Sequence, residues 1–308
     1  MLGNIKTVNR QYILFRSLCG CIAALLLLSS CAAAGADPTE TAPAEPEVTA
    51  EQNGAPDAGA EPEASPETAA DPDATPETVD LSQYSELPLP QLDPVNDGEE
   101  IAVLHTDLGD IKVRFFPEYT PNAVQNFKTL AKAGYYDGHI FNHVFENELI
   151  QTGDPTGTGT GGQSMWGRPF AVETTPCLHN IYGALTMIRG QDEYSQGSQF
   201  LIVANKSLDD ESKAELEAYK DKQDQVIATM SDGTAVPYAQ VFPVKIIDKY
   251  LEDGGIPAFD LQFTVFGQVI DGFNVIDKIA SAETSQEEET MDRPLTDIKI
   301  NGITFQAY

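Results

Sequence analysis

Three groups of residues in this chain have types and spacings that could support chemistry. His139 and His143 are four residues apart, the separation at which two imidazoles on a helix bind one zinc ion. The glycine-rich run 157–162 could offer backbone amides to a phosphate, and Ser198, between Gly197 and Gln199, has the residue type of a nucleophile. The neighbours of each group decide whether that chemistry is available.

Those neighbours argue against all three chemistries. Gly138 and the strand pattern around the histidines indicate an extended segment, in which a four-residue spacing is about 13 Å, too far for a shared metal ion. The glycine run lacks the Gly-Lys-Ser/Thr of a phosphate-binding loop, and Ser198 lacks the second glycine of a nucleophile elbow. We therefore predict neither a metal nor another cofactor.

The C-terminal two thirds of the chain consist of short apolar segments separated by Gly, Asp and Pro, a pattern typical of strands and turns. Segments 101–105 and 111–115 flank a Leu-Gly-Asp turn and predict a hairpin. Thr120 as N-cap and Pro121 at the first helical position begin a helix that Gly134 ends. Further elements are predicted as strands at 140–145, 149–151, 184–188, 200–204, 263–269 and 297–305, and as a short helix at 275–280.

Many short strands with only two main helices predict a mainly β fold. We expect a closed antiparallel eight-stranded barrel whose open ends are capped by the two helices. Residues 207–256 interrupt the pattern with a charged, helix-prone stretch and a mixed apolar stretch. We interpret them as a helical insertion in a barrel loop, because they are too few and too polar to bury a large core alone.

The N-terminal residues predict export to a membrane surface. Basic residues precede an apolar run at 18–28, which is shorter than the about 20 residues of a spanning helix and favours a signal peptide over residues 1–30. The run ends Leu-Ser-Ser-Cys, which resembles a bacterial lipobox and implies lipidation of Cys31. The predicted location is the cell membrane, lipid-anchored on its extracytoplasmic face. An uncleaved membrane anchor is the alternative.

Residues 31–97 begin with the lipidated cysteine and continue as an acidic spacer. From Ala32 to Glu100 there are 18 acidic residues and no Lys or Arg, so we predict a disordered stalk, with an acidic interaction tail as the alternative. The folded domain spans 98–308, where Cys177 is the single thiol and excludes an internal disulfide. The net charge of −30 argues against nucleic acid as a partner.

Five sequence elements in a fixed order resemble a cyclophilin-type peptidyl-prolyl isomerase. Residues 141–155, F-N-H-V-F-E-N-E-L-I-Q-T-G-D-P, align without a gap to the family's F-H-R-V-I-x-x-F-M-I-Q-G-G-D-P. The other four are the glycine loop 157–162, G-A-L-T-M at 183–187, G-S-Q-F at 197–200 and T-V-F-G at 264–267. The resemblance covers roughly 101–304, apart from the insertion, and implies the family's barrel and its rotation of Xaa–Pro bonds.

The resemblance also implies where the site lies. The family's catalytic arginine is His143 here, its pocket phenylalanine and methionine are Glu148 and Leu149, and its glutamine is kept as Gln151. Leucine nearly conserves the volume of methionine. The carboxylate of Glu148 at the pocket mouth costs desolvation unless it is paired. The other implied site residues are Gly159, Ile188, Arg189, Gly190, Gln199, Leu201 and Phe263.

Three interpretations of His143 stay open. Its imidazole donates the hydrogen bond that the family's arginine supplies, and isomerisation is slower. Alternatively, His143 is an inert rim residue of a domain that only binds peptides. In the third interpretation Arg189 replaces the missing charge, unless it is paired with Glu148 and fills the site instead.

The resemblance therefore implies a peptidyl-prolyl cis-trans isomerase, a foldase for Xaa-Pro bonds of exported polypeptides. Uncatalysed isomerisation takes tens to hundreds of seconds, which gives such an activity a physical purpose. The alternative is a catalytically inactive chaperone or scaffold module that binds proline-containing segments. The expected partners are proline-containing exported polypeptides and, through the lipid, the membrane. We expect the chain to be a monomer.

Overall fold

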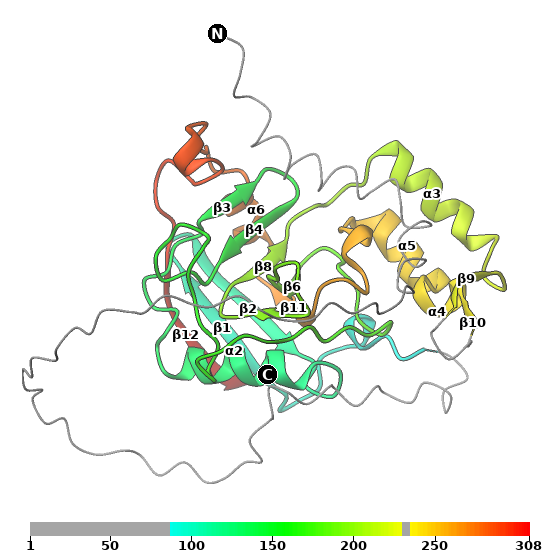
Figure 1. The fold of residues 1–308 in the computed structure, drawn as a ribbon, viewed down its shortest axis with the longest axis horizontal. Helices are drawn as coiled ribbons and strands as arrows, with labels where there is room; N and C mark the ends of the chain where they lie inside the picture. The colour runs from blue at the N-terminus through cyan, green and yellow to red at the C-terminus, as the bar shows by residue number, and fades with distance from the viewer. Residues whose placement is uncertain (1–86, 230–234) are drawn as a thin grey trace, which may run out of the picture. The chain divides into compact units, whose positions relative to one another are not determined.

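The computed structural model describes residues 87–229 and 235–308. Its central element is an antiparallel sheet with the strand order β12-β1-β2-β11-β6-β8-β4-β3 (Figure 1). The predicted mainly β, eight-stranded antiparallel fold is confirmed. The strands are β1 (Glu100–Thr106), β2 (Gly109–Phe115), β3 (His143–Phe145), β4 (Leu149–Thr152), β6 (Ala184–Met187), β8 (Phe200–Val203), β11 (Val265–Asp271) and β12 (Ile300–Ala307).

The sheet is curled into a half-barrel, although a closed barrel was predicted (Figure 1). The edge strands β3 and β12 are not neighbours in the ladder order. Instead, Ile140 forms a bridge with Lys299, and the Phe141 amide donates to the Ile298 carbonyl at 2.9 Å. The predicted strand 140–145 therefore divides into a segment that pairs with residues just before β12 and the short strand β3, which pairs with β4.

Two helices, α2 (Pro121–Lys132) and α6 (Phe273–Ala280), pack against the barrel core, as predicted. Their apolar residues recur at helical spacing, so each presents one apolar face to the strands. Thr120 is the N-cap residue of α2, but its side chain makes no capping hydrogen bond. The Glu173 carboxylate caps the helix instead, accepting from the amides of Asn122 at 3.0 Å and Ala123 at 2.9 Å.

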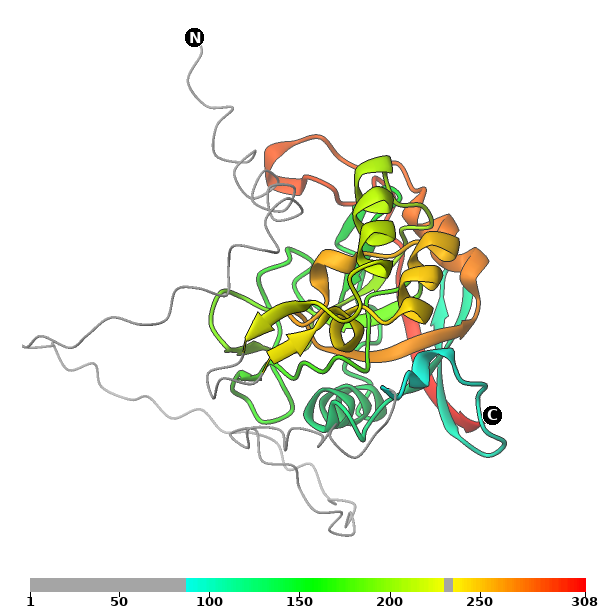
Figure 2. The same ribbon diagram turned by 90° about the vertical axis from the view of Figure 1, so that its right-hand side faces the viewer.

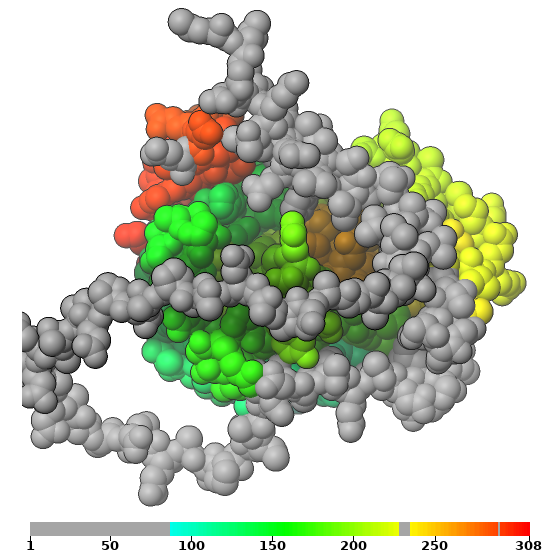
Figure 3. Space-filling model, in the orientation of Figure 1, coloured from blue at the N-terminus to red at the C-terminus, as the bar shows by residue number. Residues whose placement is uncertain are grey.

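The insertion contains α3 (Asp210–Lys220), α4 (Tyr238–Val241) and α5 (Val244–Asp253), and its strands β9 (Val226–Thr229) and β10 (Ala235–Pro237) pair with each other. Helices α3 and α5 pack together outside the barrel (Figure 2). In the space-filling view the insertion forms the yellow flank of the molecule (Figure 3). Its apolar cluster includes Ile181 from outside the insertion, and Tyr250 of α5 donates to Asp260 at 2.8 Å. The insertion thus shares its core with the barrel domain.

The segment before β1 is attached to the barrel. It contains the short helix η2 (Pro90–Leu92), whose Gln91 side chain accepts from the His179 amide at 2.6 Å and donates to the His179 carbonyl at 2.8 Å. Residues 87–97 therefore pack on the domain, although the sequence places them in the spacer. The predicted signal peptide, Cys31 and the spacer up to residue 86 lie outside the described residues. Among those described, no helix is long and apolar enough to cross a membrane.

Candidate active site

Strands β3, β4 and β8 lie side by side and bring several predicted site residues together. His143 is opposite Gln151, and Gln151 is opposite Leu201, so the three residues form a row across the sheet. Leu149 lies two residues before Gln151 and shares its face, because side chains alternate along a strand. Thr186 of β6 is opposite Leu201, and the backbone amide of Ile188, just beyond β6, donates to the Gln199 carbonyl at 3.0 Å.

An apolar wall adjoins this row. Its cluster contains the predicted substrate contacts Leu149, Leu201, Ile188 and Phe263. Leu149 and Leu201 are buried, whereas Ile188 and Phe263 pack at the edge of the cluster and are half-buried. Partly exposed apolar side chains on a rigid base form a surface that a proline ring can contact with little loss of conformational entropy.

The two glutamines connect the strands to the glycine loop. The Gln151 side-chain amide donates to Gln199 at 2.8 Å, and Gln199 donates to the carbonyls of Gly161 at 2.7 Å and Gly159 at 3.2 Å. The buried Asp154 carboxylate holds the loop from within. Its Oδ2 atom accepts from four consecutive backbone amides, residues 158–161.

These amide hydrogen bonds are made to the charged carboxylate. Although burial opposes ionisation, the hydrogen bonds lower the pKa of Asp154 to about 2. The loop is thus fixed by an ionised side chain at neutral pH, and it presents Gly159 to the site.

His143 lies directly beneath that loop. A Cβ atom added to Gly159, whose φ is +82°, would be 2.4 Å from His143 Nε2. On its other side the imidazole stacks with Phe145, with ring centroids 6.1 Å apart. Nδ1 of His143 is buried, and a hydrogen bond of the ring with the Met291 backbone favours its charged form. Burial lowers the pKa of His143, and the charge of Asp292 is the largest influence opposing this shift. The imidazole is therefore mainly neutral at pH 7.

Arg189 makes its hydrogen bonds to the backbone. Its guanidinium donates to the carbonyls of Gln262 at 3.0 Å, Gly190 at 3.1 Å and Gln191 at 3.2 Å. Because Gln262 precedes Phe263, these bonds join the two loops that carry Ile188 and Phe263. Gly190 is exposed on the same loop.

Glu148 lies in the turn between β3 and β4. Its amide donates to the Phe145 carbonyl at 3.0 Å, and its carbonyl accepts from Ala204 at 2.8 Å. These bonds place Glu148 beside Leu149, with its side chain half-buried. The predicted roles of Glu148, Arg189 and the other site residues stay predictions.

The structure adds residues to the site that the sequence analysis did not identify. Phe145 and Phe259 belong to the apolar wall. Phe145 could have been found from its spacing, since it is two residues from His143 on the same strand. Asp292 had no such signal, because it reaches His143 from the distant segment that follows the short helix η4 (Glu288–Thr290), drawn in orange-red near β3 in Figure 1.

Backbone strain is located around the same site. Among the described residues, three that are not glycine have a left-handed backbone: Asn147 (φ 57°), Leu261 (φ 59°) and Asp292 (φ 64°). The first precedes Glu148, the second lies two residues before Phe263, and the carbonyl of the third accepts from Val144 at 2.8 Å. Such conformations are costly and tend to occur at functional sites.

Comparisons with known proteins show the family of the chain. A family model described as cyclophilin type peptidyl-prolyl cis-trans isomerase/CLD matches residues 101–305. A Staphylococcus aureus (strain USA300) protein provisionally named a peptidyl-prolyl cis-trans isomerase is 38% identical over 218 residues, which are 70% of this chain and 98% of that protein. The chain belongs to the cyclophilin-type peptidyl-prolyl cis-trans isomerase family.

Two further proteins show the extent of the similarity. A Staphylococcus saprophyticus protein with the same provisional name is 36% identical over 215 residues, which are 70% of this chain and 96% of that protein. A cyclophilin type isomerase of Cryptosporidium parvum, crystallised in the presence of the dipeptide Ala-Pro, is 25% identical with a TM-score of 0.49. That alignment covers 68% of this chain and 99% of the other.

Proposed function

We propose that this chain catalyses cis–trans isomerisation of Xaa–Pro bonds in exported polypeptides, at the site formed by β3, β4 and β8. Family membership supplies the reaction class. The observation that carries the site assignment is the row of His143, Gln151 and Leu201 beside the apolar wall. An Xaa–Pro segment has polar backbone groups beside an apolar proline ring. The polar side chains of the row can bind the backbone groups, and the apolar wall can contact the ring.

The reaction requires no covalent step. Amide resonance makes the barrier to rotation about 18–20 kcal/mol, and rotation breaks that resonance. Ile188 and Phe263 would hold the proline ring away from water. Gln151, Gln199 and the Gly159 backbone would hold the flanking peptide, so that rotation occurs about one bond only.

The rotating bond needs a donor to the proline nitrogen, which gains a lone pair as resonance is lost. In this proposal His143 is that donor, at the position of the family's arginine. A neutral imidazole offers one N–H, and hydrogen bonds from an ionised donor are roughly twice as strong. We therefore expect isomerisation that is slower than with a guanidinium. The three carbonyl bonds of Arg189 favour a positioning role for this residue over direct donation.

Exchange spectroscopy on an Ala-Pro peptide mixed with the full-length chain tests this function. Cis–trans exchange cross-peaks at a protein concentration far below that of the peptide are the expected result. Broadening of the peptide signals without exchange would indicate a proline-binding module that lacks the chemistry. No effect on the peptide would contradict both the isomerase and the proline-binding module.

We further propose that Cys31 is lipidated and holds the domain at the extracytoplasmic face of the cell membrane, a proposal that rests on the sequence motif. In cells grown with labelled palmitate, the wild-type chain should carry the label and sediment with membranes. Cys31→Ala should lose the label. A wild-type chain that is unlabelled but still membrane-bound would instead support the uncleaved anchor.

A further inference from the structure

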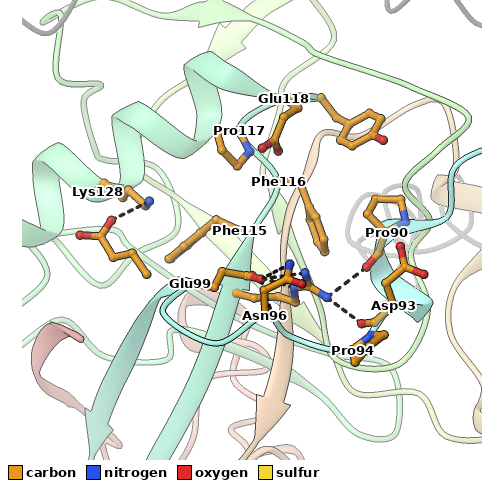
Figure 4. Close-up of a pocket in the computed structure, with 13 residues that line it drawn as sticks. Pro90, Asp93, Pro94, Asn96, Glu99, Phe115, Phe116, Pro117, Glu118 and Lys128 are labelled. Carbon is orange, nitrogen blue, oxygen red and sulfur yellow. Dashed lines mark hydrogen bonds and ion pairs between the residues drawn. The ribbon is translucent and has the colours of Figure 1, made fainter. Parts of the chain in front are cut away.

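A groove outside the candidate active site opens at the turn between β2 and α2 (Figure 4). It has a cavity volume of about 650 Å³. The segment before β1 forms one side and the residues that follow β2 form the other. Its floor includes the buried side chains of Phe115 and Phe116, and prolines line part of its rim.

The two cationic side chains of the groove are already paired. The Arg114 guanidinium makes two hydrogen bonds to the Glu99 carboxylate, at 2.9 and 3.0 Å, and donates to the carbonyls of Asp93 at 2.8 Å and Pro90 at 3.1 Å (Figure 4). Lys128 is paired with Glu100 at 2.8 Å, and its ammonium lies 5.0 Å from the centre of the Phe115 ring. Neither cation is therefore available to an anionic ligand.

The carboxylates are in excess. Four acidic side chains line the groove against two cations, which leaves two negative charges. Asp93 and Glu118 are exposed, and their carboxylates have no hydrogen-bond or ion-pair partner among the described residues. The half-buried ring of Tyr119 lines the same groove, whereas the buried Phe116 ring already has the Arg114 guanidinium over it, 5.4 Å from its centre. A ligand with a positive charge on an apolar stem complements both features, since aromatic faces also attract cations.

We propose that this groove binds a lysine or arginine side chain of an extended polypeptide. The acidic segment of the chain itself is a poor occupant, because residues 32–100 contain no Lys or Arg. Phe116 and Tyr119 pack in the same cluster as Leu149 and Leu201, so the groove and the candidate active site share an apolar wall. The groove thus selects substrates that have a basic residue near the isomerised proline. That the ligand is a polypeptide rests on the proposed function.

Calorimetric titration of the full-length chain with two proline-free peptides tests the groove without requiring isomerisation. The probe is acetyl-Ala-Gly-Lys-Gly-Lys-amide, and its neutral counterpart has glutamine in place of both lysines. The test variant is Asp93→Asn/Glu118→Gln. The control variant, Glu211→Gln/Asp224→Asn, makes the same change in net charge at exposed positions of the insertion. This control is needed because a chain of charge −30 attracts any cation at long range.

We expect the test variant to bind the lysine peptide about three- to tenfold more weakly at low salt, as two exposed ion pairs predict. The control should change affinity less than twofold, and binding of the glutamine peptide should not depend on either variant. Lysine-peptide binding should also shift the amide signals of Phe116, Glu118 and Tyr119. Equal weakening in both variants, or unchanged affinity in the test variant, would overturn the proposal.

The proline assay separates the two proposals. In peptides with Ala-Pro ahead of the lysines, the test variant should raise KM and leave kcat unchanged. With glutamines in place of lysines, KM should also be unchanged. If the lysine peptide binds in the groove but Ala-Pro peptides show no exchange, the groove proposal is supported and the isomerase proposal is contradicted. If Ala-Pro peptides show exchange but the lysine peptide does not bind in the groove, the isomerase proposal is supported and the groove proposal is contradicted.

Discussion

His143 has an environment that opposes the charge which an arginine would carry at its position. It lies under the glycine loop, against Phe145, and its Nδ1 is buried. Burial lowers its pKa, whereas Asp292 opposes that shift. The same contact works in both directions, because burial raises the pKa of Asp292 and His143 lowers it. The imidazole is thus a donor whose charge depends on pH.

We predict that kcat/KM for an Ala-Pro peptide rises as the pH falls from 8 toward 5. The His143 pKa lies below its ordinary value, so the imidazolium forms only when the pH drops below that range, and it is the stronger donor. In Asp292→Asn the rise should move to lower pH, because a carboxylate that raises the His143 pKa is removed. Activity measured across this range checks both, and a flat profile would contradict the prediction that the imidazolium is the stronger donor.

A second prediction concerns the identity of the donor. His143→Arg should raise kcat/KM by about tenfold, the gain of roughly 1.4 kcal/mol expected when a neutral donor becomes charged. His143→Ala should lower it. If neither variant changes the rate while Ala-Pro peptides still bind, His143 is a rim residue. Arg189→Lys serves as the comparison. It should raise KM, because Arg189 joins the two loops that carry the proposed substrate contacts.

At the scale of elements, the glycine loop 157–162 depends on one side chain from the end of β4. Asp154 Oδ2 accepts from four consecutive amides, and the nearest, Gly159, is at 2.6 Å. This acidic residue, together with the Gln199 side chain, therefore holds the loop above His143. Its low pKa, about 2, means that this support persists down to strongly acidic pH and is lost as the pH falls through that value.

Asp154→Asn should lower the free energy of unfolding by about 1–3 kcal/mol, because an amide replaces a charged acceptor and turns one donor toward the loop's own amides. Urea denaturation at pH 7 measures this. Glu211→Gln, an exposed change on α3, serves as the control and should alter stability by less than about 0.5 kcal/mol. An Asn variant as stable as the wild type would show that the loop is held by other contacts.

At the scale of the whole molecule, a buried carboxylate couples the α2 helix to a distant loop. Glu173 is 1% exposed and accepts from the first amides of α2, yet burial raises its pKa to about 7. The unfolded chain releases this proton near pH 4.5. Between these values the folded state binds the extra proton, so stability is fully present below pH 4.5 and decreases as the pH rises through 7.

We therefore predict a loss of at most about 3 kcal/mol between pH 4.5 and 8 that Glu173 causes. Glu173→Gln should remove this part of the pH dependence, while keeping one acceptor for the helix amides. Urea midpoints of wild type and variant, compared across this range, give the measurement. Parallel pH profiles of the two proteins would mean that Glu173 is ionised in the folded state at all these pH values.

Local sequence features determined the elements of this protein. Alternating apolar residues and turn residues lie within a few positions of each other, so β1, β2 and α2 could be located from the chain alone. The fixed order of motifs from 141 to 267 also determined the family. One error of detail is instructive: predicted strand 140–145 is divided, because its first residues pair with residues near Lys299 rather than with β4.

Only the tertiary structure decided the electrostatics and connections of the site. Asp292, Glu173 and the Gln262 carbonyl that accepts from Arg189 come from parts of the chain whose proximity no local pattern records. The pKa of a buried group depends on burial and on charges a few ångströms away, whatever their separation in sequence. For this reason the sequence determined the barrel and the row of site residues, whereas the charge of His143 and the role of Arg189 depend on the folded arrangement.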